Sequence, residues 1–151
     1  PGVVKPGSRN SDIVSNLDFA ETFLDIAGAK IPKDMQGTSI LPLLKGQTPK
    51  DWRTHFYYHY YEFPGAHSVA RHYGITNGRH KLIYFYQNNE WELFDLGKDP
   101  NELSSVYGNS DYTKIQTDLL AKLKHLRVQY KVPEKDPDSI DNTPKPPRKK
   151  K

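Results

Sequence analysis

The chain has 151 residues, with 22 Lys and Arg, 18 Asp and Glu and no Cys, and this length is typical of one domain. Five of the cations, Lys145 and Arg148 to Lys151, fall within the last seven residues, and without them the net charge of +4 becomes −1. The basic character therefore belongs to a tail, which excludes nucleic-acid binding by a uniformly basic folded surface. The lack of Cys excludes disulfides, thiolate metal sites and cysteine nucleophiles.

The sequence starts at Pro1, and its one methionine is Met35. We therefore expect a processed or excised piece of a longer protein. It contains neither a signal peptide nor an apolar run long enough to cross a bilayer. The apolar content of 35% is below the roughly 45–50% of ordinary domains. We expect either a modest core, built largely of aromatic residues, or a core that depends on a neighbouring domain.

Two helices are predicted in the first third of the chain. Residues 1–10 carry Pro-Gly pairs that indicate turns in an extended segment. Helical spacing of apolar residues predicts a helix at about 15–28, which Ser15 can cap and which Gly28 can end in a left-handed conformation. This helix is apolar on two sides, so we expect a core helix that is covered on both. A short helix is predicted at about 39–44.

The pattern then changes to a period of two. Strands are predicted at 55–61, 68–76, 81–86 and 91–94, since these segments are rich in aromatic and β-branched residues. Asn77-Gly78, between the second and third of them, is a strong signal for a hairpin. We therefore expect an antiparallel sheet of three to four strands.

A long helix follows the sheet. Apolar residues recur every three to four positions over about 111–130, and Asp111 is the predicted N-cap. Residues 133–151 are dominated by Pro, Asp and Lys, which predicts a disordered or extended tail. The fold class expected from the residues is α+β, with the antiparallel sheet packed by the long C-terminal helix.

Composition and spacing supply no complete catalytic constellation. His55 and His59 are four residues apart, but on a strand this spacing separates them by about 13 Å, too far to share a metal ion. No nucleophile elbow and no phosphate-binding glycine loop occur. His67, Arg71 and His72 surround one loop-to-strand junction, where they could hold an anion or sugar hydroxyls. The alternative for this junction is a solvated loop with one structural arginine.

Five short segments, taken in order, carry a resemblance to a known family. They are PGVVKPG at 1–7, SNLDFAETFLDIAG at 15–28, QGTSILPLL at 36–44, RHKLI at 79–83, and ELFDL with DPNE within 92–102. Together they resemble the C-terminal part of a type I, formylglycine-dependent sulfatase of the alkaline-phosphatase-like superfamily. ARHYGI at 70–75, followed by EWEL at 90–93, is most similar to N-acetylglucosamine-6-sulfatases and mucin-desulfating sulfatases.

The resemblance implies a fold and a division of the chain. Residues 1–50 would be the end of the large α/β sulfatase domain, 51–132 a C-terminal subdomain packed on it, and 133–151 a tail. It implies an enzyme that hydrolyses sulfate esters of a carbohydrate, with 6-O-sulfated N-acetylglucosamine in glycosaminoglycan or mucin as the expected substrate. A periplasmic, secreted or lysosomal location is implied as well.

The resemblance also implies two cofactors that this sequence cannot supply. Sulfatases use Ca²⁺ and a formylglycine made from Cys or Ser in a C/S-x-P-x-R motif, and that motif is absent here. The chain alone is therefore expected to be inactive, with no catalytic residue and no metal ligand. Its expected role is sugar recognition, because the C-terminal subdomain of the family leans over the pocket. The predicted substrate-binding residues are His72, Arg71 and His67.

Two other functions stay open at this point. The first is the C-terminal part of a phosphodiesterase or phosphonate hydrolase of the same superfamily, whose nucleophile would be an unmodified Thr or Ser. The second is a nucleic-acid-binding module, in which the aromatic strand 55–61 stacks on bases beside the basic tail 145–151. We disfavour nucleic acid and membrane as partners, because the rest of the chain is not basic and core packing explains the aromatic strand equally well.

Overall fold

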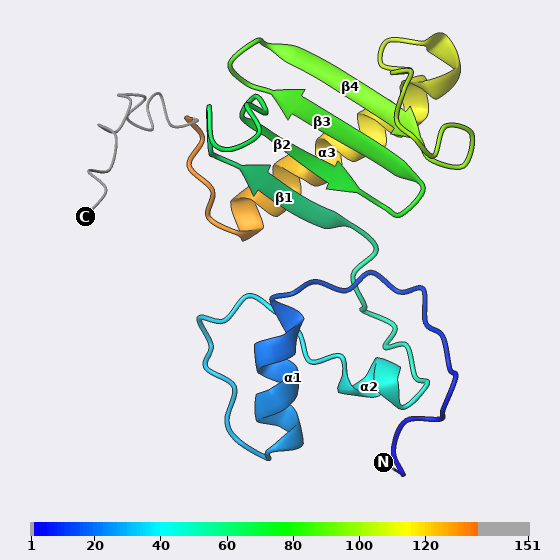
Figure 1. Cartoon of the computed structure of the whole chain (residues 1–151), viewed down its shortest axis with the longest axis vertical. Helices are drawn as coiled ribbons and strands as arrows, with labels where there is room; N and C mark the ends of the chain where they lie inside the picture. The colour runs from blue at the N-terminus through cyan, green and yellow to red at the C-terminus, as the bar shows by residue number, and fades with distance from the viewer. Residues whose placement is uncertain (1, 136–151) are drawn as a thin grey trace, which may run out of the picture. The chain divides into compact units, whose positions relative to one another are not determined.

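The chain consists of two compact units, which divide between Phe56 and Tyr57. The computed structural model describes residues 2–135, so that residues 136–151 of the predicted tail lie outside the described residues. Figure 1 shows two helices in the N-terminal unit and, in the C-terminal unit, a sheet with one long helix. Within 2–135, no helix combines the length and the apolar character needed to cross a bilayer.

The first helix, α1, is shorter than its apolar pattern predicts. It runs over Asp18–Ile26, and Leu17 holds the N-cap position without a side-chain cap, so the prediction of Ser15 as the cap is wrong. Ser15 instead lies in a preceding turn, where its N–H donates to the Asp18 carboxylate at 2.7 Å. Gly28 ends the helix with a φ of +67°, which confirms the predicted left-handed position.

The burial of α1 is the reverse of that of an ordinary amphipathic helix. Its buried residues are Asp18, Glu21 and Thr22. The large apolar side chains on and beside it are exposed, namely Leu17, Phe19, Phe23 and Ile26. Within the described residues nothing covers this apolar face, so the expected core helix is not found there.

The buried polar side of α1 holds the N-terminal unit together. Asp18 is 0% exposed, and its two carboxylate oxygens accept from the Arg53 guanidinium at 2.6 and 2.8 Å. The same oxygens accept the backbone N–H groups of Ser15 and Thr38 at 2.7 and 2.9 Å. A carboxylate with four donors is fully compensated for its burial. It ties three distant segments of the chain together.

The other two buried side chains of α1 fix the segment that leads to the second helix. Glu21 accepts the N–H of Gly37 at 2.6 Å, and Thr22 accepts the N–H of Ile40 at 2.9 Å. A Cβ at Gly37 would collide with the Glu21 carboxylate, so this close approach requires glycine. The predicted short helix, α2, follows at Leu41–Leu44, with a proline in its first turn.

The C-terminal unit contains the expected antiparallel sheet. Its four strands lie side by side in chain order: β1 (Phe56–Tyr60), β2 (His72–Thr76), β3 (His80–Phe85) and β4 (Glu90–Asp95). The predicted strand at 68–76 is too long, because residues 68–71 belong to the connection between β1 and β2. The predicted hairpin between β2 and β3 is confirmed, since Gly78 has a φ of +86° and the Asn77 side chain accepts the N–H groups of Arg79 and His80.

Helix α3 (Thr113–Gln129) covers one face of the sheet. It is preceded by a 3-10 helix at Ser110–Tyr112, and the capping side chain there is Asn109, which accepts the N–H of Asp111. The prediction of Asp111 as the cap is therefore wrong. The apolar core lies between α3 and the sheet and consists of Tyr73, Ile75, Leu82, Leu93, Leu119, Leu123 and Leu126.

Alternation along the strands gives the sheet a second, different face. Tyr73 and Ile75 of β2 point toward α3, so His72 and Gly74 lie on the opposite face. The register places Ile83 of β3 beside Gly74, and Glu92 of β4 beside Ile83. We call this surface, opposite α3, the open face.

Candidate functional site

The predicted site lies in the connection between β1 and β2, residues 61–71. Its sharpest feature is a turn in which the Ser68 N–H donates to the Pro64 carbonyl at 2.7 Å, with Ser68 at a φ of +52°. His67 immediately precedes Ser68 and is exposed. The structure therefore presents His67 to solvent on a tight turn.

His72 is the first residue of β2 and is half-buried on the open face. Its Nδ1 lies 2.8 Å from the Ala70 carbonyl oxygen. A carbonyl can only accept, so Nδ1 carries the hydrogen, and Nε2 of the neutral ring is an acceptor. The ring stacks on Tyr60 with centroids 5.4 Å apart. His72 is thus held in one tautomer, and Nε2 can bind a sugar hydroxyl or, when protonated, an anion.

Arg71 has a different environment from its neighbour. Its side chain is buried, at 1% exposed. The guanidinium lies 3.5 Å from the Phe63 carbonyl oxygen, and the Arg71 N–H lies 3.4 Å from Oε1 of Gln87. Adjacent residues of an extended chain point to opposite sides, so Arg71 and His72 diverge. The three predicted residues share one connection, but Arg71 is buried whereas His67 is exposed, and Arg71 and His72 point to opposite sides.

The open face also carries a polar cluster that the sequence patterns did not indicate. Lys81 and Glu102 form an ion pair of 2.7 Å, and Glu92 lies near them. Burial, then the neighbouring carboxylates of Glu90 and Glu102, raise the pKa of Glu92. Glu92 therefore holds a proton more readily than an ordinary glutamate does.

Tyr58 of β1 reaches across the open face. A Cβ on Gly74 would collide with the Tyr58 ring and hydroxyl, so the ring lies directly over this glycine. Burial, followed by the charges of Glu102 and Glu92, raises the pKa of the Tyr58 hydroxyl. That hydroxyl is buried and has no hydrogen-bond partner among residues 2–135. The signal that could have found it is Gly74, because a glycine inside a strand indicates close approach of another group.

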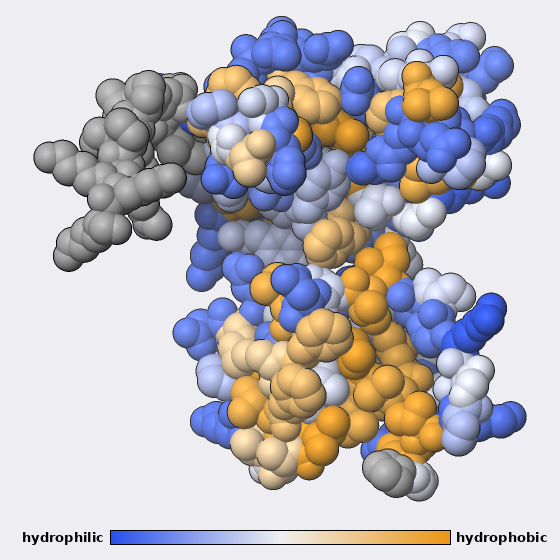
Figure 2. Space-filling model, in the orientation of Figure 1, coloured by the Kyte–Doolittle hydropathy of each residue, from blue (hydrophilic) through white to orange (hydrophobic). Residues whose placement is uncertain are grey.

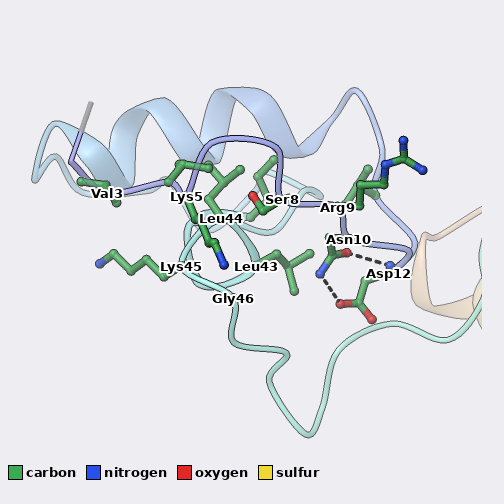
Figure 3. A pocket seen from close by; sticks show the side chains of 13 residues that line it. Val3, Lys5, Ser8, Arg9, Asn10, Asp12, Leu43, Leu44, Lys45 and Gly46 are labelled. Atoms are coloured by element: carbon green, nitrogen blue, oxygen red, sulfur yellow. Dashed lines mark hydrogen bonds between the residues drawn. The ribbon is translucent and has the colours of Figure 1, made fainter.

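A hollow of about 580 Å³ lies in the N-terminal unit, far along the chain from the predicted site. Figure 3 shows Lys5 and Lys45 beside the apolar side chains of Leu43 and Leu44. Its one carboxylate, Asp12, accepts from Asn10 and Thr48, which lowers its pKa. The walls of this hollow therefore combine apolar side chains with lysines and one hydrogen-bonded carboxylate.

No catalytic cofactor site can be assembled from the described residues. Between residues 2 and 135, no group of three or more His, Asp or Glu side chains could hold a metal ion. The sequence also lacks the C/S-x-P-x-R motif. The chemistry of the present side chains is that of hydrogen bonding, stacking and ion pairing.

Comparison with known proteins adds a family and a set of relatives. The family described as N-sulphoglucosamine sulphohydrolase, C-terminal, matches residues 1–129. The chain is 48% identical to an N-acetylglucosamine-6-O-sulfatase of Bacteroides thetaiotaomicron, over 91% of this chain and 25% of that protein. It therefore spans about a quarter of the length of this curated relative.

Solved structures agree in fold. One structure, described as a complex with its substrate D-glucosamine-2-N,6-O-disulfate, has a TM-score of 0.87 and 46% identity, over 92% of this chain and 29% of that chain. A phosphonate monoester hydrolase from Silicibacter pomeroyi has a TM-score of 0.72 at 21% identity, over 84% of this chain and 27% of that chain. At that identity the second likeness concerns the fold alone.

Proposed function

Because the chain belongs to the family of C-terminal domains of N-sulphoglucosamine sulphohydrolases, we propose that it is the C-terminal part of a sulfatase that hydrolyses the 6-O-sulfate ester of N-acetylglucosamine or a related glucosamine unit. The observation that carries this proposal is the 48% identity to an N-acetylglucosamine-6-O-sulfatase across 91% of the chain. Glycosaminoglycan or mucin chains would be the polymers that contain such units. We also propose a periplasmic, secreted or lysosomal setting for the enzyme.

The residues of this chain contribute recognition rather than bond cleavage. Sulfatases generally depend on formylglycine and Ca²⁺. This sequence lacks the C/S-x-P-x-R motif, and within residues 2–135 no group of three or more His, Asp or Glu side chains could hold a metal ion. Those two cofactors would come from the preceding part of the protein, and the chain alone would release no sulfate. His72, fixed by Ala70, would bind a sugar hydroxyl through Nε2, and the exposed His67 would make a further contact. Arg71 belongs to the same connection.

The N-terminal unit would form the end of the large sulfatase domain. Its exposed apolar residues on α1 need a partner surface, and Figure 2 shows hydrophobic residues gathered over this unit. A continuous apolar patch on a soluble protein marks an interface. The division at about residue 50 is therefore part of the proposal, with residues 51–132 as the subdomain that contacts the sugar.

Sulfate release from defined sugars tests the proposed activity. The full-length protein is incubated with N-acetylglucosamine 6-sulfate, with galactose 6-sulfate as the control, and free sulfate is measured by ion chromatography. Release from the first sugar alone is expected. Turnover of a phosphonate monoester without any sulfate release would favour the hydrolase alternative. Salt-sensitive binding of single-stranded nucleic acid without either activity would favour the binding module.

One substitution tests the site within this proposal. Replacing His72 by Ala should lower kcat/KM on the sulfated sugar by on the order of tenfold, because a hydrogen bond to substrate is lost. His125, exposed on α3, gives the matched control, and His125→Ala should leave kcat/KM unchanged. Equal kinetics for His72→Ala and the parent enzyme would remove His72 from the site.

A further inference from the structure

The connection between β1 and β2 has little apolar packing of its own. Residues 64–69 are all exposed, and the one backbone hydrogen bond within them runs from Ser68 to Pro64. Ordering a solvated segment of this length costs about 1–2 kcal/mol per residue in conformational entropy. A buried side chain that contacts the connection can offset part of this cost.

Arg71 is that side chain. It is among the largest fully buried residues of residues 2–135. Its guanidinium is directed at the Phe63 carbonyl, near the start of the connection, and Arg71 itself is the last residue of the connection. Its N–H also approaches Gln87, in the turn between β3 and β4. Arg71 thus contacts the start of the connection through its side chain and the neighbouring turn through its backbone N–H.

We infer that Arg71 is a positioning residue: it holds residues 61–70 in the shape that presents His67, and does not itself touch the substrate. The kinetic consequences of this inference rest on the proposed sulfatase function, whereas its structural consequence does not depend on that function. Arg71 is thereby reassigned from the binding role that its place in the sequence indicated, because a guanidinium that is 1% exposed cannot reach a sugar outside the connection.

The guanidinium suits this role better than an ammonium would. Its planar group offers several donors in fixed directions, so it can serve carbonyl oxygens at the edge of a loop while its stem packs against apolar neighbours. A lysine would provide one compact and strongly hydrated charge in the same space. Arg71→Lys is therefore expected to preserve the charge and still loosen the connection.

Amide hydrogen exchange in the full-length protein tests the structural half. Arg71→Lys and Arg71→Ala should raise exchange rates in residues 62–70 by about tenfold or more, as for a segment that has lost its anchor. Exchange in α3 should stay at the parent rate, which separates local loosening from global unfolding. His67→Ala is the matched control, because it removes an exposed ring and should change exchange in neither segment.

A double-mutant cycle tests the kinetic half, with N-acetylglucosamine 6-sulfate as the substrate. If Arg71 acts through the connection, Arg71→Ala should lower kcat/KM about tenfold in the parent enzyme and less than twofold in a His67→Ala background. Fully additive losses, or unchanged exchange in residues 62–70, would overturn the inference in favour of direct contact. If no variant and no parent protein releases sulfate, the proposed function fails, and the exchange result still decides the role of Arg71.

Discussion

The helices of the two units bury opposite kinds of side chains. In the N-terminal unit, α1 turns Asp18, Glu21 and Thr22 inward and leaves its phenylalanines in solvent. In the C-terminal unit, α3 buries leucines against the sheet. The first arrangement depends on hydrogen bonds and one ion pair, and the second on apolar burial, which is the dominant stabilising term in folding. The difference teaches that, within residues 2–135, the buried apolar cluster belongs to the C-terminal unit.

Separating the units should therefore have the largest effect. Residues 57–135, expressed alone, should unfold in one cooperative transition and give a dispersed amide NMR spectrum, because the sheet and α3 supply a complete core. Residues 2–56 alone should show neither property, because their apolar side chains remain in water. A cooperative transition in residues 2–56 would show that the buried polar network is sufficient to fold this unit. It would contradict the difference drawn between the two units.

Disrupting the buried ion pair should give the next largest effect. Asp18→Asn leaves the Arg53 guanidinium, whose side chain is 19% exposed, without its carboxylate. Removal of one partner of such a pair costs about 3 kcal/mol. Urea unfolding of the full-length protein measures this loss. Asp25→Asn is the matched control on the exposed side of the same helix, and should cost less than about 0.5 kcal/mol.

Much of the fold follows from local patterns, and the corrections arise where a distant partner intervenes. The sheet, the Asn77-Gly78 hairpin and the long helix are all predicted by the spacing of apolar residues and by the turn residues. The side of α1 that is buried cannot be predicted in this way. The spacing of its apolar residues indicates an apolar face, and it cannot show that Asp18 pairs with Arg53, 35 residues away. Periodicity alone therefore identified the helix and misjudged which side is buried in this chain.

The candidate site shows the same limit. The residues near the junction are visible in the sequence, since His67, Arg71 and His72 stand close together. Their different environments are not visible, because the burial of Arg71 and the exposure of His67 depend on how the connection folds. Glu92 joins the open face through strand pairing, which no short motif records, and Gly74 is the one sequence signal for Tyr58.

The proposed interface on α1 gives a smaller effect that sharpens the comparison. Phe23 is 69% exposed on α1, and Val128 is 72% exposed on α3, so they are matched in exposure. Phe23→Ser should cost about 2 kcal/mol in the full-length protein, the value of one buried phenylalanine, and less than about 0.5 kcal/mol in the chain alone. Val128→Ser should cost little in both. Equal costs for Phe23→Ser in the two proteins would argue against an interface on α1.

The smallest expected effect concerns pH and His80, a buried polar residue of the C-terminal unit. Burial lowers the pKa of His80 from its ordinary value of 6.5, although Asp95, 3.8 Å away, favours the charged ring. The unfolded chain therefore binds the proton at a higher pH than the folded unit does. The free energy of unfolding should thus decrease as the pH falls from about 6.5 toward the lower folded value.

His80→Gln should flatten this part of the pH dependence, which urea unfolding at several pH values between 7.5 and 5 would measure. Tyr112→Phe is the control, because it removes a 3.3 Å hydrogen bond to Asp95 and no group that titrates in this range. It should lower the free energy of unfolding by a similar amount at each pH and leave the slope unchanged. An equal slope in the His80→Gln variant would mean that the folded unit holds the His80 proton as tightly as the unfolded chain. The attraction of Asp95 for the charged ring would then balance the effect of burial on the pKa of His80.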